Sequence, residues 1–179
     1  AKSQFVYDEQ DKYYSLLNVG TTVGYEAPAG TYAHLRGNVT TSRTWVKDDA
    51  VNPWREIHAQ YDNFGNPRKA WDLSGDQTRF VETEYAAGYY YAYPTRTISP
   101  APDPTGVRGT DQTSAVTMTY DFHTGRPLSV TDANGQTTSV EYDGKLRTKR
   151  VNPPAGGKIV EFDYGDTPGN LYLKQRRQV

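Results

Sequence analysis

The sequence predicts an all-β protein, an array of short antiparallel β-hairpins that forms a curved or spiralling sheet. Three observations predict this fold class. Apolar and polar residues alternate with period two between turns, Gly-containing turns recur along the chain, and no stretch combines the apolar stripe of a helix with capping residues. We therefore expect residues 1–179 to be one segment of repeats.

The composition predicts a folded chain with a thin, largely aromatic core. The 179 residues include 15 Tyr and 3 Trp, and the net charge of −1 makes self-repulsion weak. The absence of cysteine excludes disulfides and thiolate chemistry. No apolar run approaches the ~20 residues that span a bilayer, so no membrane span is expected in this segment. The start of the chain lacks a signal-peptide pattern and begins in mid-repeat, as expected of a piece of a longer polypeptide.

The repeated element is a Tyr-Asp pair followed by a Gly-containing turn. The template G-x-P-x-x-x-x-D-x-x-G fits residues 65–75 and 125–135, and a Tyr-Asp pair precedes each copy. Repeat anchors are expected near residues 7, 32, 61, 85, 120, 142 and 164. The structural repeat motif comprises Tyr61, Asp62, Gly65, Pro67, Asp72 and Gly75, then Tyr120, Asp121, Gly125, Pro127, Asp132 and Gly135, and finally Tyr142 with Asp143.

Strands are expected on both sides of these turns. Val116, Met118 and Tyr120 share one face of a strand, and the same alternation recurs at 128–130, 140–142 and 160–164. Residues 72–75 and 132–135 are turn signals, because Asn and Gly tolerate positive φ and an Asp side chain can bond the following backbone. The segment 94–112 carries four prolines and two glycines, so it is expected to be an inserted, exposed loop, with a shorter excursion at 47–53.

These residues resemble the YD repeats of the Rhs family, which includes insecticidal toxin-complex components and teneurins. The resemblance is carried by residues 61–66, 120–128 and 131–137 and extends over roughly half the chain. It implies successive hairpins whose sheet spirals into a hollow shell, of which this chain would be a segment. Bacterial members enclose a C-terminal toxin or effector, whereas teneurins are cell-surface adhesion receptors. The resemblance thus implies toxin encapsulation or display by a secreted or cell-surface protein, with flanking repeats as partners.

A structural role explains why the pair recurs. Repeated units that stack edge to edge need the same turn and the same bonding groups each time. A Tyr ring packs across strands while its hydroxyl stays hydrogen-bonded, and the following Asp can satisfy backbone amides in the next turn. Catalytic use of Asp62, Asp72, Asp121, Asp132 and Asp143 would duplicate the same chemistry without purpose. No catalytic residue, cofactor or metal is expected, and the protein is not predicted to be an enzyme.

The aromatic run Tyr89, Tyr90, Tyr91 and Tyr93 is a possible binding surface. With Trp45, Trp54 and Trp71 it could stack on sugars or meet a partner, so the alternative function is a free-standing carbohydrate- or protein-binding adhesin module. The favoured interpretation is a strand or edge whose Tyr residues cover both faces of a thin sheet.

Other motifs are weaker. Residues 103–106 resemble the D-P-x-G core of the motif near which many Rhs shells cut themselves, but a Pro-rich turn is the favoured interpretation over a self-cleaving protease centred on Asp103. The isolated His34, His58 and His123 lack metal-ligand spacing, and Ser114, Ser129 and Ser139 lack a nucleophile elbow. The basic clusters at 145–150 and 174–177 are read as solvated strand surface, with no nucleic acid as partner.

Overall fold

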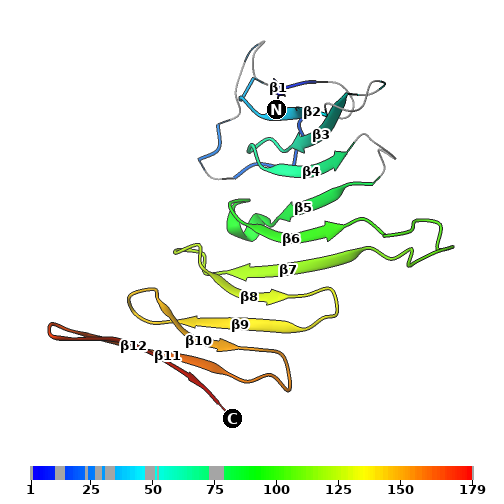
Figure 1. The fold of residues 1–179 in the computed structure, drawn as a ribbon. Helices are drawn as coiled ribbons and strands as arrows, with labels where there is room; N and C mark the ends of the chain where they lie inside the picture. Colours follow the sequence, from blue (N-terminus) through cyan, green and yellow to red (C-terminus); the bar gives the residue numbers. More distant parts are fainter. Residues whose placement is uncertain are drawn as a thin grey trace. The chain divides into compact units, whose positions relative to one another are not determined.

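A computed structural model describes residues 2–10, 15–22, 24–26, 30, 35–46, 51, 53–72 and 79–178. The chain divides into two compact units, residues 1–114 and 115–179. Each unit is a sheet whose strands follow one another in chain order, and the described strand pairs within each unit are antiparallel (Figure 1). The all-β prediction is confirmed. The expected anchor at Tyr32, the turn at Gly75 and His34 lie outside the described residues.

The described residues of the first unit form six complete strands and one turn of 3-10 helix. Its elements are β1 (Ser3–Tyr7), β2 (Val39–Trp45), β3 (Trp54–Tyr61), β4 (Pro67–Asp72), β5 (Val81–Tyr85), η1 (Ala87–Tyr89) and β6 (Pro94–Ser99). Hairpins join β3 to β4 and β5 to β6 through short turns, whereas a long connection separates β1 from β2. Part of that connection lies on the β3–β4 turn, because Leu17 forms a parallel bridge with Asp62.

The second unit begins at the division inside β7. Its strands are β7 (Ser114–Tyr120), β8 (Pro127–Thr131), β9 (Thr137–Tyr142), β10 (Thr148–Asn152), β11 (Val160–Thr167) and β12 (Asn170–Arg177). Each strand pairs with the next through a short hairpin, as sequences of β-branched residues between Gly-containing turns favour. The described residues contain one helix, η1, which is three residues long. No described helix could cross a bilayer.

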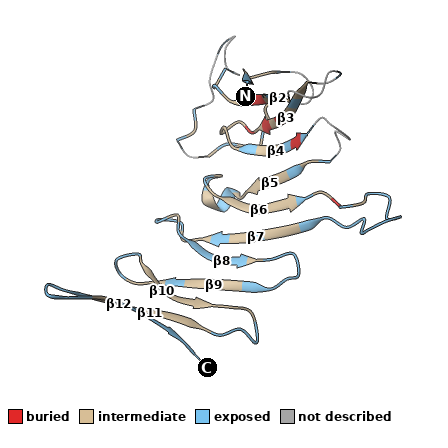
Figure 2. Ribbon diagram, in the orientation of Figure 1, coloured by how far each residue is buried: buried red, intermediate tan, exposed pale blue. Residues whose placement is uncertain are grey.

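The two faces of the second unit differ in chemistry, because side chains alternate along each strand. On one face Thr117, Thr131 and Thr137 stand in register, and the last two hydroxyls are 2.8 Å apart. On the other face Met118 stands in register with Val130. Within residues 115–178 no residue is fully buried, as Figure 2 shows for β7 to β12. This unit is therefore a single-layer sheet.

The described part of the first unit buries a small and mostly polar group of residues. Trp71 is 7% exposed, and it stacks on the His58 ring at a centroid distance of 6.0 Å. His58 in turn contacts the hydroxyl of Thr41 at 3.0 Å. The buried residues are Thr40, Thr41, His58, Gln60, Asp62, Trp71 and Ala101.

The prediction of a loop over 94–112 is wrong for its first six residues, which form β6. Pro94 is the first residue of that strand, where its missing N–H costs no interior ladder bond. It faces Tyr85, just as Pro67 faces Tyr61 and Pro127 faces Tyr120. Pro94 therefore occupies the proline position of the repeat, and the connection to β7 runs from Pro100 to Thr113.

Candidate functional site

The recurrent turns share one hydrogen-bonding geometry, centred on an aspartate. In the turns that begin at Asp62, Asp132 and Asp143, one carboxylate oxygen accepts the amides two and four residues later, all at 2.9 Å. The aspartate amide donates to the carbonyl four residues later, also at 2.9 Å. Each carboxylate thus closes its turn from the inside, as an Asx-type cap does. The amide donors to the carboxylate are Phe64 and Asn66, Asn134 and Gln136, and Lys145 and Arg147.

The fourth residue of these turns has positive φ. Gly65 and Gly135 occupy it with φ of 87° and 77°, which glycine adopts without strain. In the turn at Asp143 the same position is Leu146, with φ of 60°. Leu146 thus adopts a conformation that is costly for an ordinary side chain.

Two other aspartates cap turns of different length. Asp121 precedes a turn that is one residue longer, and its carboxylate accepts the amide and the hydroxyl of Thr124, both at 2.8 Å. Asp8 closes the long β1–β2 connection by accepting three successive amides, those of residues 36–38, at 2.7 to 3.0 Å. The carboxylate is therefore the constant part of the motif, while the intervening chain varies. Asp72 ends β4, and the turn that follows it lies outside the described residues.

The anchor tyrosines sit at a fixed place in the hairpin. Tyr7, Tyr61, Tyr85 and Tyr120 each end a strand and face the first residue of the next strand, with a β-bulge or register shift beside the pair. Tyr142 and Thr148 repeat the arrangement. Because a bulge re-aims the neighbouring side chain, it helps to direct the tyrosine toward the preceding hairpin.

Three of the anchor tyrosines predicted from the sequence, one of them inside β11, bond the preceding repeat. The hydroxyls of Tyr61, Tyr142 and Tyr164 donate to backbone carbonyls at 3.0, 2.8 and 2.8 Å. In every case the acceptor is the first residue of the strand that leaves the turn of the preceding Tyr-Asp pair. The acceptors are Val39, Pro127 and Thr148. We call the tyrosine, its acceptor carbonyl and the aspartate of the preceding Tyr-Asp pair the inter-repeat clamp.

A basic side chain adds to the clamp. The guanidinium of Arg147 lies 4.0 Å from the centroid of the Tyr164 ring, and that of Arg126 lies 5.2 Å from the Tyr142 ring. Each arginine is the last residue of the turn of the preceding Tyr-Asp pair, so the contact joins the same two repeats as the hydroxyl bond does. Cations over aromatic faces at such distances attract the ring electrostatically.

Arg147 is also the centre of the strongest charge cluster in the second unit. It makes a bidentate contact with Asp166 at 2.7 and 2.9 Å, and its Nε donates to Asp143 at 2.8 Å. Lys145 lies 2.9 Å from the same Asp166 carboxylate. Hydrogen bonds from Arg147, then from Lys145, lower the pKa of Asp166 to about 2. The backbone amide of Arg147 and then its side chain lower the pKa of Asp143.

The pKa shift of Tyr61 favours the protonation state that the clamp needs in the first unit. Burial, followed by the charge of Asp8, raises the pKa of Tyr61, so its hydroxyl keeps the proton that it donates. In the second unit the hydroxyl of Thr124, followed by its amide, lowers the pKa of Asp121. That aspartate therefore remains a carboxylate acceptor.

The aromatic run forms a turn, so the interpretation of it as a strand or edge is wrong. Tyr89 ends η1, and Tyr90 and Tyr91 follow with positive φ of 51° and 58°. The Tyr91 ring stacks on Phe64 at a centroid distance of 4.8 Å, and its hydroxyl donates to Val19. Tyr91 thus packs against the β3–β4 turn. Tyr90 is 55% exposed.

Asp103 organises its own loop. Its carboxylate accepts the hydroxyl of Thr105 at 2.6 Å and the amide of Arg108. These bonds, that of Thr105 first, lower the pKa of Asp103 to about 2. The arrangement is that of a closed turn at residues 103–110, consistent with the Pro-rich turn interpretation.

The remaining predicted positions are dispersed. His123 is exposed in the β7–β8 turn, and among the described residues no group of three metal-ligating side chains converges. His58 also contacts Glu56 on its own strand. The contacts of His58 with Thr41 and Trp71 were missed by sequence reasoning, because they join separate strands. Trp45 and Trp54 pair across β2 and β3 at 5.2 Å. In the basic cluster at 145–150, Lys145 and Arg147 both contact Asp166.

The hairpins share one kind of capped turn, and the inter-repeat clamp joins a hairpin to the one before it. This arrangement defines a β-hairpin repeat protein. A family model described as RHS Repeat matches residues 120–158, which include two Tyr-Asp pairs and three capped turns. This match covers 39 of the 179 residues and identifies that part of the chain as an Rhs-type repeat. No curated protein matches the chain.

Proposed function

We propose that the chain is a wall segment of an Rhs-type shell that encapsulates or displays a C-terminal toxin, effector or partner. The inter-repeat clamp carries this proposal. Each clamp joins a hairpin only to the hairpin before it, so a wall can grow by adding units of the same kind. A single layer without fully buried residues in 115–178 suits a wall better than a free-standing domain, which needs two packed layers.

The role that we propose for this segment is structural. The aspartate carboxylates of its turns accept hydrogen bonds from backbone amides, and we propose no catalytic step for them. Its partners would be the flanking repeats and the enclosed or displayed segment, and the parent protein would act outside the cell or at its surface.

The test uses the natural polypeptide that contains these residues. Electron microscopy should show residues 2–178 within the wall of a hollow particle, and a segment inside it should resist protease until the wall is opened. A particle without a cavity, or a C-terminal segment that is cleaved as fast in the native protein as in urea, would contradict the proposal.

The adhesin alternative has its own test. Tyr90 is the better probe, because replacing Tyr91 would remove its packing on Phe64. Binding of the chain to a glycan array that is lost in Tyr90→Ala, with an unchanged amide spectrum, would favour a binding module. Equal or absent glycan binding by both proteins would leave the wall as the better account.

A further inference from the structure

A buried histidine of the first unit lies between two carboxylates. His58 is 2% exposed on β3, and its ring stacks on Trp71 of β4. Its Nδ1 lies 3.0 Å from the hydroxyl oxygen of Thr41, and its Nε2 lies 3.3 Å from Oε2 of Glu56. The hydroxyl of Thr41 in turn donates to Oε2 of Glu9 at 2.6 Å. Because a buried ring nitrogen cannot exchange such neighbours for water, the protonation of the ring must fit them.

Neither neutral form of the ring fits these contacts. If Nδ1 alone carries a proton, the lone pair of Nε2 faces the carboxylate of Glu56. If Nε2 alone carries a proton, Thr41 must donate to Nδ1, and its oxygen then faces the Glu9 carboxylate at 2.6 Å with no proton between them. A ring protonated on both nitrogens donates to Thr41 and turns an N–H toward Glu56, while Thr41 keeps its bond to Glu9. The imidazolium form therefore satisfies all three contacts.

The charges next to the ring balance when His58 is a cation. Nε of Arg43 on β2 lies 2.6 Å from Oε1 of Glu56. With Glu9, the described group thus holds two carboxylates and one guanidinium before the histidine is counted. Burial of the ring favours its neutral form, whereas the opposite charges and the set of acceptors favour the cation. An unpaired negative charge in this group would be costly, so the second effect is the larger one.

The neighbouring strands place their own polar groups around this cluster. On β1, the residues opposite the cluster are Gln4 and Val6, which are neutral. On β4, Lys69 faces Gln60, and Asp72 points to the other face of the sheet because side chains alternate along a strand. Within the described chain, the charged residues that contact the histidine or its direct partners are therefore the two glutamates and the arginine named above.

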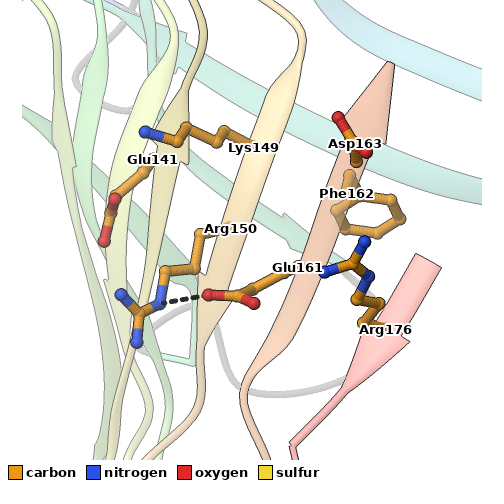
Figure 3. Close-up of a pocket in the computed structure, with 7 residues that line it drawn as sticks. All are labelled: Glu141, Lys149, Arg150, Glu161, Phe162, Asp163 and Arg176. Carbon is orange, nitrogen blue, oxygen red and sulfur yellow. Dashed lines mark ion pairs between the residues drawn. The ribbon is translucent and has the colours of Figure 1, made fainter. Parts of the chain in front are cut away.

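A charged row in the second unit shows why burial matters. Glu141, Arg150, Glu161 and Arg176 face one another across β9 to β12. Figure 3 shows these residues beside a shallow hollow, with the Arg150–Glu161 ion pair of 3.9 Å drawn as a dashed line. The side chains of that pair are 33% and 41% exposed, so water can solvate either charge when its partner is lost. The side chain of His58 is 3% exposed, so its charge depends on its protein neighbours.

We propose that His58 is a buried imidazolium that holds β2, β3 and the segment after β1 together, and that its loss of a proton at alkaline pH destabilises the first unit. A histidine in an unfolded chain has a pKa of about 6.5, so the unfolded chain has lost this proton at higher pH while the folded chain retains it. The stabilising contribution is therefore complete below that pH and declines as the pH rises. This inference goes beyond the wall proposal, and it depends only on contacts within the first unit, so either proposal can fail without the other.

Nitrogen NMR of the ring measures the charge state directly. In the isotope-labelled folded chain at about pH 7.5, both ring nitrogens of His58 should carry protons, whereas the same residue in urea should show the neutral ring. The signals are assigned through the side-chain carbons of His58, so no substitution is needed. An unprotonated ring nitrogen in the folded chain would overturn the proposal, and this includes the case in which a glutamate carries the proton instead.

The pH dependence of stability tests the consequence. Urea denaturation followed by Trp fluorescence reports on the first unit, because Trp45, Trp54 and Trp71 all lie in it. Above about pH 6.5, the ratio of folded to unfolded chain should fall by up to about tenfold for each pH unit, as the loss of one proton requires.

Matched variants assign this dependence to the cluster. Glu56→Gln removes the carboxylate that faces Nε2 and should flatten the dependence. Glu84→Gln is the control, because Glu84 pairs with Arg96 across β5 and β6 at 3.3 Å and should leave the dependence unchanged. A flat dependence in the unchanged chain, or the same dependence in the two variants, would overturn the proposal.

Discussion

The hydroxyl of Tyr142 donates a 2.8 Å hydrogen bond to the carbonyl of Pro127, the first residue of β8. Asp121 caps the turn that leads into Pro127, and Tyr142 is the anchor of the following hairpin. The bond therefore ties one repeat to the next. Since the second unit has no fully buried residue between 115 and 178, such bonds add to the backbone ladders that hold neighbouring hairpins in register.

Tyr142→Phe tests this bond directly. The substitution removes the hydroxyl and keeps the ring under Arg126, so we expect a loss of about 0.5–1.5 kcal/mol in the free energy of unfolding. Urea denaturation measures it. Tyr7→Phe is the control, because Tyr7 is 54% exposed and should tolerate the change. Equal losses for the two variants would show that the hydroxyl bond between repeats contributes nothing specific.

Leu146→Gly should stabilise the chain. Leu146 has φ of 60° at the position where two equivalent turns have glycine. A side chain in this region costs about 1–2 kcal/mol and a glycine costs about 0.5–1 kcal/mol of chain entropy, so a net gain of about 0.5–1 kcal/mol is expected. Urea denaturation measures the gain. Leu146→Ala removes the same apolar side chain without relieving φ and should not stabilise. Gly135→Ala should destabilise by about 1–2 kcal/mol, and a neutral result there would contradict the strain argument.

Gly165→Ala should destabilise the β11–β12 hairpin. Gly165 faces Tyr172, whose ring lies over it so closely that a Cβ would overlap ring atoms. An aromatic ring over a strand glycine is a known stabilising arrangement, and overpacking it costs about 1–3 kcal/mol. Thermal denaturation measures the loss. Gly144→Ala is the matched control, since a Cβ there meets nothing within 4 Å. Similar losses at the two glycines would rule out the ring as the cause.

Acid should weaken the second unit through Asp166. Because Arg147 and Lys145 lower its folded pKa to about 2, below the usual ~3.9, its stabilising contribution is complete above about pH 4 and is lost as the pH falls toward 2. Asp166→Asn should therefore lower the unfolding midpoint at pH 6 and flatten the dependence of stability on pH between 4 and 2. Urea denaturation at several pH values measures both effects. A variant whose pH dependence matches that of the unchanged chain would disprove the assignment to this cluster.

The candidate site was only partly visible in the sequence. Turn positions could be read from local chemistry, since Gly65 and Gly135 are needed where φ is positive and Asp62 or Asp132 bonds amides within its own turn. The bond from Tyr164 to Thr148 could not be read in this way, because its two ends are 16 residues apart and meet only through strand pairing. The proline of β6 was missed because no Gly precedes it in the template position.

The sequence by itself determined the all-β class, the period-two strands and the places of the capped turns, because these depend on the backbone preferences of neighbouring residues. The tertiary structure alone decided which carbonyl each tyrosine reaches, how Arg147 joins Asp143 to Asp166, and that Tyr91 packs on Phe64. The physical reason is register. A shift of one residue between strands would turn every side chain to the opposite face, and only the paired strands fix which face each side chain takes.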